Sequence, residues 1–262
     1  MNEIEKFAGL IPRFTTYDCE YTCEKHGKVK GYYFEHGGER EYVCPKCEEE
    51  ARKAEQEAEF ARQAEYIRRR EREAMYKSRN IEPEYWDKEL KDFIPQTPEQ
   101  EKALEAVKKM IADKSGKVIL LGSNGVGKTF LGSMAVKALG GKILSMYEIT
   151  TMIRMSYSAR AEKTELEIVQ DLASIPMLVI DEMGRTKGSD AELNWLSYIL
   201  DKRHTRDLPF MILTNTHLSR DCPKKGCDFC FERFVNNDVL SRLRQNSSII
   251  TIKAPDFRAK RG

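Results

Sequence analysis

Five short apolar segments divide the second half of the chain. They lie at Val118–Leu121, Ile143–Leu144, Met177–Ile180, Phe210–Leu213 and Ile249–Ile252. Runs this short, bounded by glycine or polar residues, predict buried β-strands. Between them, apolar residues recur at helical spacing, as after Thr129 and from Tyr147 to Ser174. Strands that alternate with helices predict an α/β domain.

The first third of the chain has a different pattern. Two short stretches, Gly31–Phe34 and Glu41–Val43, flank His36-Gly-Gly38 and predict a hairpin. From Glu48 to about Ser78 charged residues and alanine dominate, and acid-first pairs such as Glu49/Lys53 favour a solvated helix. The alanine seam on that helix is too thin for a strong coiled coil. We therefore expect a small module over residues 1–48, a charged helical linker over 49–79, and the α/β domain over 80–262.

The residues ahead of the first strand of the α/β domain predict the start of a helix. Thr97 is placed to cap the helix, Pro98 suits its first position, and Gln100 is placed to close a capping box. The apolar spacing carries this helix to Lys114-Ser-Gly116. Phe93 and Ile94, just before it, are placed either to cover a nucleotide base or to pack in the core.

Composition narrows the setting of the protein. The net charge is +2, so any nucleic-acid surface must be a local basic patch. The sequence contains no apolar run of the about 18 residues that a membrane span needs, and its first residues lack a signal-peptide pattern. We expect no membrane association and a cytoplasmic location, in which the seven cysteines are reduced or bound to metal.

The strand at Val118–Leu121 runs into a phosphate-loop motif, G-x-x-x-x-G-K-T, from Gly122 to Thr129. Its glycines let the backbone N–H groups turn toward phosphate oxygens, Lys128 is placed to contact the β- and γ-phosphates, and the Thr129 hydroxyl to ligate Mg²⁺. We expect ATP or ADP to be bound by Gly122, Ser123, Asn124, Gly125, Val126, Gly127, Lys128, Thr129 and Phe130.

Two further strands end in polar pairs. Asp181 and Glu182 follow Met177–Ile180; Asp181 is placed to hold a magnesium-bound water and Glu182 to polarise the attacking water. Asn215 follows Phe210–Thr214 and is placed to contact the γ-phosphate or to orient the water, with a plain turn at the strand end as the other interpretation. The strand at Lys142 is expected to place the phosphate-loop and acidic strands apart in the sheet. Arg203 is expected either to line the same cleft or to lie on the surface.

Six of the seven cysteines fall into two groups with metal-ligand spacing. The first predicts a Zn²⁺ site formed by Cys23, His26, Cys44 and Cys47, with Cys19 as the alternative to His26. Unrelated free thiols are the other interpretation. A module this short has little core of its own, so a metal is the expected source of its stability. The second group, His217, Cys222, Cys227 and Cys230, is a possible second Zn²⁺ site, in which Cys227 and Cys230 are the strongest pair.

The ordered motifs from about Asp92 onward resemble the DnaC/DnaI replicative helicase loaders, most closely their phage-encoded versions, and the related IstB transposition helper ATPases. These motifs are the phosphate loop, Leu-Val-Ile-Asp-Glu-Met-Gly184, Thr214-Asn215 and Ser241-Arg-Leu-Arg244. The resemblance implies an AAA+ P-loop ATPase with a five-stranded parallel sheet. It also implies that Asn215 is the sensor 1 residue and that Arg242 is an arginine finger completing hydrolysis in a neighbouring subunit.

The resemblance implies partners as well. In the loaders the N-terminal part binds the hexameric replicative DNA helicase, and in DnaI-type members it carries zinc, as the module at Cys23–Cys47 would. It also implies that residues 147–163 bind single-stranded DNA and that the subunits self-associate through their ATPase domains. We expect a helicase loader with weak, Mg-dependent, DNA-stimulated ATP hydrolysis as a release switch. The alternative is a transposition helper that acts on duplex DNA, and such helpers usually lack the N-terminal module. The Cys222–Cys230 segment departs from the family pattern.

Overall fold

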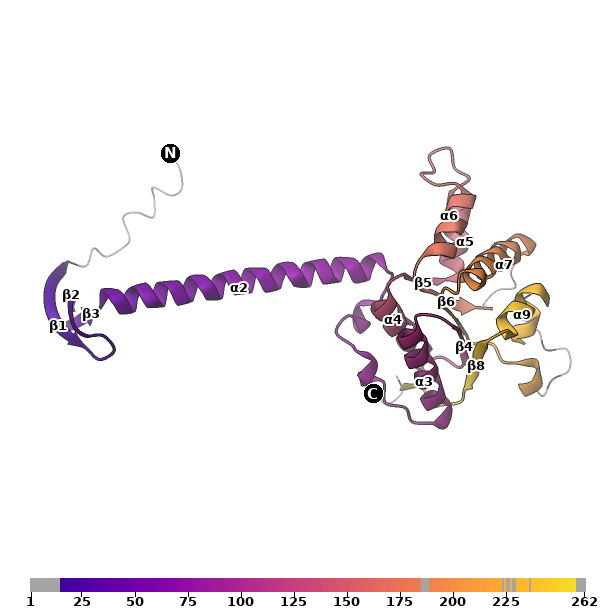
Figure 1. Cartoon of the computed structure of the whole chain (residues 1–262), viewed down its shortest axis with the longest axis horizontal. Coiled ribbons are helices and arrows are strands. Elements are labelled where there is room, and N and C mark those ends of the chain that lie inside the picture. Colours follow the sequence, from indigo (N-terminus) through magenta and orange to yellow (C-terminus); the bar gives the residue numbers. More distant parts are fainter. Residues whose placement is uncertain are drawn as a thin grey trace. The chain divides into compact units, whose positions relative to one another are not determined.

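The chain forms two units, which divide between Glu71 and Arg72. The computed structural model describes residues 15–184, 189–222, 224, 227, 230–235 and 237–257 (Figure 1). Each unit has its own sheet, one of three strands and one of five.

The first unit is a three-stranded antiparallel sheet. Its strands are β1 (Thr16–Cys23), β2 (Gly27–His36) and β3 (Glu39–Val43). The predicted hairpin is present as β2 and β3, and Gly37 and Gly38 between them both have positive φ, which glycine adopts without strain. The strand β1 was not predicted. None of its eight residues is aliphatic, so the periodic apolar signal is weak.

A single helix, α2 (Pro45–Ser78), follows β3. It contains no buried residue, as expected for a solvated helix, and Glu49 pairs with Lys53 in the predicted i,i+4 order at 2.6 Å. Among the described residues, no helix combines the length and apolar character needed to cross a membrane.

Two short turns of 3₁₀-helix, Pro83–Tyr85 and Leu90–Asp92, lead into α3 (Pro98–Asp113). The predicted start of α3 is correct, because Thr97 Oγ1 accepts the N–H of Gln100. The predicted capping box is incomplete. It would require Gln100 Oε1 to accept the N–H of Thr97, but this oxygen accepts the N–H of Gln96 instead. Gln100 is fully buried, so its side chain is committed to the interior rather than to the helix end.

The five predicted strands form one parallel sheet. They are β4 (Lys117–Gly122), β5 (Lys142–Ser145), β6 (Leu178–Met183), β7 (Phe210–Thr214) and β8 (Ser247–Ile252), in the order β5-β6-β7-β4-β8. The phosphate-loop strand β4 and the acidic strand β6 are separated, as expected. However, β7 lies between them and β5 lies at the edge, so the predicted position of the Lys142 strand was wrong. Sequence order does not fix the spatial order of parallel strands, because each crossover can pass a neighbour.

Helices cover both faces of this sheet (Figure 1). Alternate residues of β4 divide between two apolar clusters: Val118 and Leu120 pack with α3 and α4 (Lys128–Leu139). Ile119 and Leu121 pack on the other face, in the cluster formed by the helices α5 (Met146–Met155), α6 (Glu165–Ser174), α7 (Asp190–Thr205) and α9 (Asn237–Arg244). The helical region predicted from Tyr147 to Ser174 is thus two helices, α5 and α6. The strands read as continuous apolar runs because both faces are covered.

Candidate nucleotide site and metal-binding groups

The loop between β4 and α4 has the backbone of a phosphate cradle. Gly122, Gly125 and Gly127 all have positive φ, which a residue with a Cβ rarely adopts. A Cβ on Gly122 would lie 2.5 Å from the backbone oxygen of Ile252, and one on Gly127 would lie 2.4 Å from Cε2 of the buried Phe93. The loop ends at the N-terminus of α4, which favours an anion. The glycines are therefore required by both conformation and space.

Lys128 joins this loop to the end of β7. Its ammonium donates to the carbonyl oxygens of Gly122 and Ser123, at 2.8 Å each, and to Oδ1 of Asn215 at 2.9 Å. The Asn215 amide in turn donates to Oδ1 of Asn124 in the loop, at 2.8 Å. The side chains predicted to contact the phosphates from β7 and from the loop are thus already in contact with each other.

The acidic end of β6 lies beside the same loop. Thr129 Oγ1 donates to Oδ2 of Asp181 at 2.9 Å, which brings together the two residues predicted to ligate Mg²⁺. Burial raises the pKa of the Asp181 carboxyl, while the N–H of Glu182 and the Thr129 hydroxyl act in the opposite direction. A hydroxyl and a carboxylate form a donor set suited to a hard cation such as Mg²⁺.

Glu182 is exposed and has an unusual backbone. Its φ is 54°, in the left-handed region, which is strained for a residue with a long side chain. The β6–β7 register shifts between Ile180 and Met183, so Asp181 and Glu182 form an irregularity at the strand end. Such bulges redirect side chains and occur often beside active sites. This one separates the two acids: Asp181 contacts Thr129 and Glu182 is left exposed.

Two neighbours of the phosphate loop were missed or left open by sequence reasoning. Gln100 Nε2 donates to the carbonyl of Val126 at 3.1 Å, so the first turn of α3 holds the loop. Phe93 is buried against Gly127 and packs on Phe130, with ring centroids 5.6 Å apart, whereas Ile94 is 72% exposed. The core-packing interpretation therefore holds for Phe93. The sequence pattern explained Gln100 as a helix-capping residue, so its hydrogen bond to the phosphate loop was not predicted.

The two arginines singled out in the sequence have different outcomes. Arg242 lies on α9, but its side chain is outside the part of the chain that the structure describes. Arg203 neither lines the cleft nor lies on the surface, so both expectations for it were wrong. It is fully buried, and its guanidinium donates to the carbonyl oxygens of four residues, Leu172, Ile175, Pro176 and Pro209. Burial lowers its pKa to about 10, so it remains charged at neutral pH.

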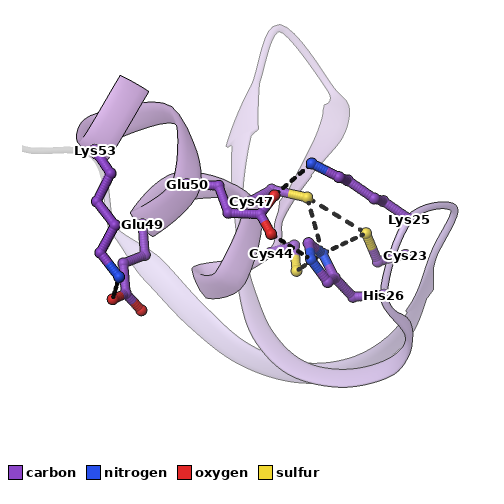
Figure 2. Close-up of polar contacts among 8 residues, drawn as sticks. All are labelled: Cys23, Lys25, His26, Cys44, Cys47, Glu49, Glu50 and Lys53. Carbon is purple, nitrogen blue, oxygen red and sulfur yellow. Dashed lines mark hydrogen bonds and ion pairs between the residues drawn. The ribbon is translucent and has the colours of Figure 1, made fainter. Parts of the chain in front are cut away.

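In the first unit, the structure brings four predicted ligands together. The side chains of Cys23, His26, Cys44 and Cys47 converge at the end of the sheet and the start of α2 (Figure 2). Sγ of Cys23 lies 3.6 Å from Sγ of Cys47, and His26 Nδ1 lies 3.9, 3.6 and 3.3 Å from Cys23, Cys44 and Cys47. Tetrahedral Zn²⁺ with bonds of about 2.0 to 2.3 Å would require similar edges, about 3.5 to 3.8 Å. Cys19 is not part of this group.

The surroundings of these four side chains also suit a cation. Backbone N–H groups of His26 and Lys25 lower the pKa of the Cys23 thiol to about 6, whereas the contact with Cys23 raises the pKa of the Cys47 thiol to about 11, so Cys23 is the thiol most readily present as the thiolate that binds metal. On its far side, His26 Nε2 lies 3.1 Å from Oε1 of Glu50, which also pairs with Lys25 (Figure 2). Metal-bound histidines commonly contact a carboxylate in this way. Glu50 was not predicted, although it lies one helical turn after Cys47.

The second group of predicted ligands also comes together. His217, Cys222, Cys227 and Cys230 offer ligand atoms that all lie within 4.8 Å of one another. They belong to the second unit and follow the end of β7, two residues after Asn215. Neither group shares a residue with the nucleotide site.

The sheet order, the phosphate loop and the paired acids define the class of this protein. It is an ATP-binding protein with the AAA+ P-loop fold, in which Lys128, Thr129, Asp181 and Asn215 meet at the carboxyl ends of three neighbouring strands.

The chain belongs to the IstB-like ATP binding protein family, whose model matches residues 49–262. It is similar to an IS21 insertion-sequence ATP-binding protein of Pseudomonas aeruginosa, with 28% identity over 56% of this chain and 54% of that protein. It is also similar to the replicative helicase loader DnaC of Escherichia coli K12, with 24% identity over 66% of this chain and 69% of that protein.

A solved structure supports the fold. The DnaC helicase loader matches with a TM-score of 0.53 and 22% identity, covering 66% of this chain and all of that one (100%). The chain thus spans about half the length of the insertion-sequence relative and about two thirds of the loader. The family model begins at residue 49, after the first group of cysteines.

Proposed function

We propose that the second unit binds and hydrolyses ATP. The observation that carries this proposal is the meeting of Lys128, Thr129, Asp181 and Asn215, which come from separate elements, around one glycine-rich loop. The loop N–H groups and the Lys128 ammonium would bind the phosphates. Mg²⁺, held by Thr129 and Asp181, would neutralise charge on the β- and γ-phosphates.

Glu182 is the proposed general base for the attacking water. It is exposed at the end of β6, whereas the neighbouring Asp181 accepts a hydrogen bond from Thr129, and this difference supports different roles for the two carboxylates. Asn215 would orient the water or the γ-phosphate from the end of β7. Arg242, on α9, is proposed to reach the nucleotide of a neighbouring subunit, so that hydrolysis would depend on self-association.

Substitutions at these residues should affect nucleotide binding and ATP hydrolysis differently. Lys128→Ala should abolish nucleotide binding, whereas Glu182→Gln should leave binding intact and lower hydrolysis by about 10²- to 10⁴-fold. Arg242→Ala should bind ATP and lose DNA-stimulated hydrolysis. Binding is measured with a fluorescent ATP analogue and turnover by phosphate release. An Arg242→Ala protein that hydrolyses ATP normally would remove the trans assignment.

We further propose that the protein is a cytoplasmic helicase loader. The first unit, with its zinc site at Cys23, His26, Cys44 and Cys47, would bind the hexameric replicative DNA helicase. Exposed residues between α5 and α6, among them Tyr157, Arg160 and Lys163, would contact single-stranded DNA by stacking and charge. The support is the separate N-terminal unit ahead of the ATPase unit, combined with the similarity to DnaC. ATP hydrolysis would act as the release switch.

The test is the mass, by light scattering, of the protein mixed with the hexameric helicase of its host, with and without ATP. We expect a complex heavier than the free hexamer. Cys23→Ser/Cys47→Ser should lose it, while Cys19→Ser, which changes a cysteine outside the metal group, should keep it. A complex that persists in the double variant would contradict the assignment of the first unit.

The alternative is a transposition helper that assembles on duplex DNA. The IstB-like family match and the similarity to the IS21 protein favour it. No helicase complex under any nucleotide condition, together with ATP-dependent filaments on duplex DNA, would replace the loader proposal with this one.

A further inference from the structure

Backbone hydrogen bonds bring together the two ends of the segment between β7 and α9. His217 and Cys230 pair in an isolated parallel β-bridge, and the N–H of Phe231 donates to the His217 carbonyl at 2.8 Å. Phe231 is fully buried in the apolar cluster of the second unit. Two of the four possible metal ligands are therefore anchored to the core, one on each side of the segment.

The other two ligands come from the segment itself. Of its described residues from Ser219 to Cys227, only Cys222 and Cys227 are half-buried, and the rest are exposed. No apolar side chain among them explains why these two cysteines turn inward. A short segment without a core of its own is a common place for a structural metal.

The donor geometry matches a tetrahedral metal site. Sγ of Cys227 and Sγ of Cys230 each lie 3.5 Å from His217 Nε2. In a tetrahedron with Zn–S bonds of about 2.3 Å and Zn–N bonds of about 2.0 Å, a sulfur and a nitrogen lie about 3.5 Å apart. Three thiolates and one imidazole, with no carboxylate in the group, are a donor set that selects Zn²⁺.

We propose that His217, Cys222, Cys227 and Cys230 bind a second, structural Zn²⁺ ion. Binding displaces the three thiol protons, and four protein ligands leave no open position for substrate. The ion ties the end of β7 to α8 (Phe231–Phe234) and α9. Asn215 precedes the first ligand by two residues, and Arg242 follows the last by twelve. On the proposed roles of these two residues, the metal holds the γ-phosphate contact and the arginine finger in a fixed relation.

The metal content of the full-length protein tests the site. The protein is expressed without a histidine tag in zinc-supplemented medium, and zinc is measured by plasma mass spectrometry. We expect two ions per chain, one for each ligand group. Cys222→Ser/Cys227→Ser should retain one, Cys23→Ser/Cys47→Ser should retain one, and Cys19→Ser should retain two. An equal zinc content in the wild type and in Cys222→Ser/Cys227→Ser, whether one ion or two, would overturn the proposal.

A second measurement needs no substitution, so it stands even if a variant fails to fold. Zinc is exchanged for Co²⁺ in the wild-type chain, and the thiolate-to-cobalt absorption is titrated. Saturation at two equivalents is expected, and saturation at one equivalent with the first ligand group filled overturns the site. Because neither readout involves a helicase or ATP turnover, failure of the proposed helicase loading or ATP hydrolysis would leave both results unchanged.

The structural role has its own readout. In Cys222→Ser/Cys227→Ser, amide hydrogen exchange over residues 231–244 should rise at least tenfold, while exchange over β4 and α4 stays as in the wild type. Unchanged protection of residues 231–244 in a variant that has lost one zinc ion would overturn the tie between β7 and α9.

Discussion

The two units of this chain are stabilised in different ways. Between residues 15 and 71 the only buried positions are Cys23, Gly31 and Cys44. The second unit buries two large apolar clusters, one on each face of its parallel sheet. The hydrophobic effect scales with apolar area removed from water, so it can support the second unit and contributes little to the first. The contrast fits the finding that two of the three buried positions of the first unit, Cys23 and Cys44, belong to a group of candidate metal ligands.

Aromatic residues show the same contrast. In the first unit, Tyr17, Tyr33 and Tyr42 lie opposite one another across the three strands, and their rings are in contact on the sheet surface, with Tyr17 and Tyr42 each 47% exposed. In the second unit, Phe93 and Phe231 are buried. The tyrosines support strand pairing without making a core.

The largest expected effect comes from removing the metal ligands of the first unit. In Cys23→Ser/Cys47→Ser, amide protection of β1, β2 and β3 should be lost completely, because a structural zinc site contributes about 10 kcal/mol or more to folding. The melting transition of the second unit should stay within about 2 °C of the wild type. Hydrogen exchange measures the protection of the strands, and calorimetry measures the melting transition. Strands that stay protected would show that the first unit has another source of stability.

The buried arginine tests the second unit. Arg203→Met removes the donors of four carbonyl groups in the core, each of which costs about 1–3 kcal/mol when left unpaired. We expect a loss of about 3 kcal/mol or more in the free energy of unfolding, measured with urea. Arg206→Met, an exposed change three residues on, should stay within about 0.5 kcal/mol. Equal stability of the two variants would contradict a structural role for Arg203.

A smaller effect is expected from changing Glu50, which contacts His26 of the first ligand group. Glu50→Gln weakens the contact to His26 and should lower zinc affinity by about 10- to 100-fold, measured by competition with a chromophoric chelator. The control is Glu49→Gln, on the same helix, because Glu49 pairs with Lys53 and not with His26 (Figure 2). An equal affinity in both variants would mean that Glu50 does not support the ligand.

The smallest effect is expected on the surface of α2. Phe60 is 76% exposed, so Phe60→Ala should change the stability of either unit by less than about 0.5 kcal/mol, as read by the same urea and hydrogen-exchange measurements. A larger loss would mean that α2 carries a packed face, and that the first unit has more apolar stabilisation than its buried residues indicate.

Much of the nucleotide site was predictable because its residues follow local rules. The glycines of the phosphate loop need positive φ, and Asp181 and Asn215 end apolar strands, so each could be placed from its neighbours in sequence. Gln100, Glu50 and Arg203 could not be placed in this way. Each has an ordinary local explanation, as a cap, a helix-surface acid and a surface base, and each is defined by a contact with a distant residue.

The sequence by itself determined the elements and the chemistry of their ends. Apolar runs specified the five strands, the glycine-rich loop specified a phosphate site, and cysteine spacing specified two ligand groups. Only the tertiary structure decided that β7 lies between β4 and β6, that His26 rather than Cys19 joins the first metal group, and that Arg203 is interior. The reason is physical: strand order, ligand convergence and burial depend on which distant segments pack together, and local periodicity carries no record of that choice.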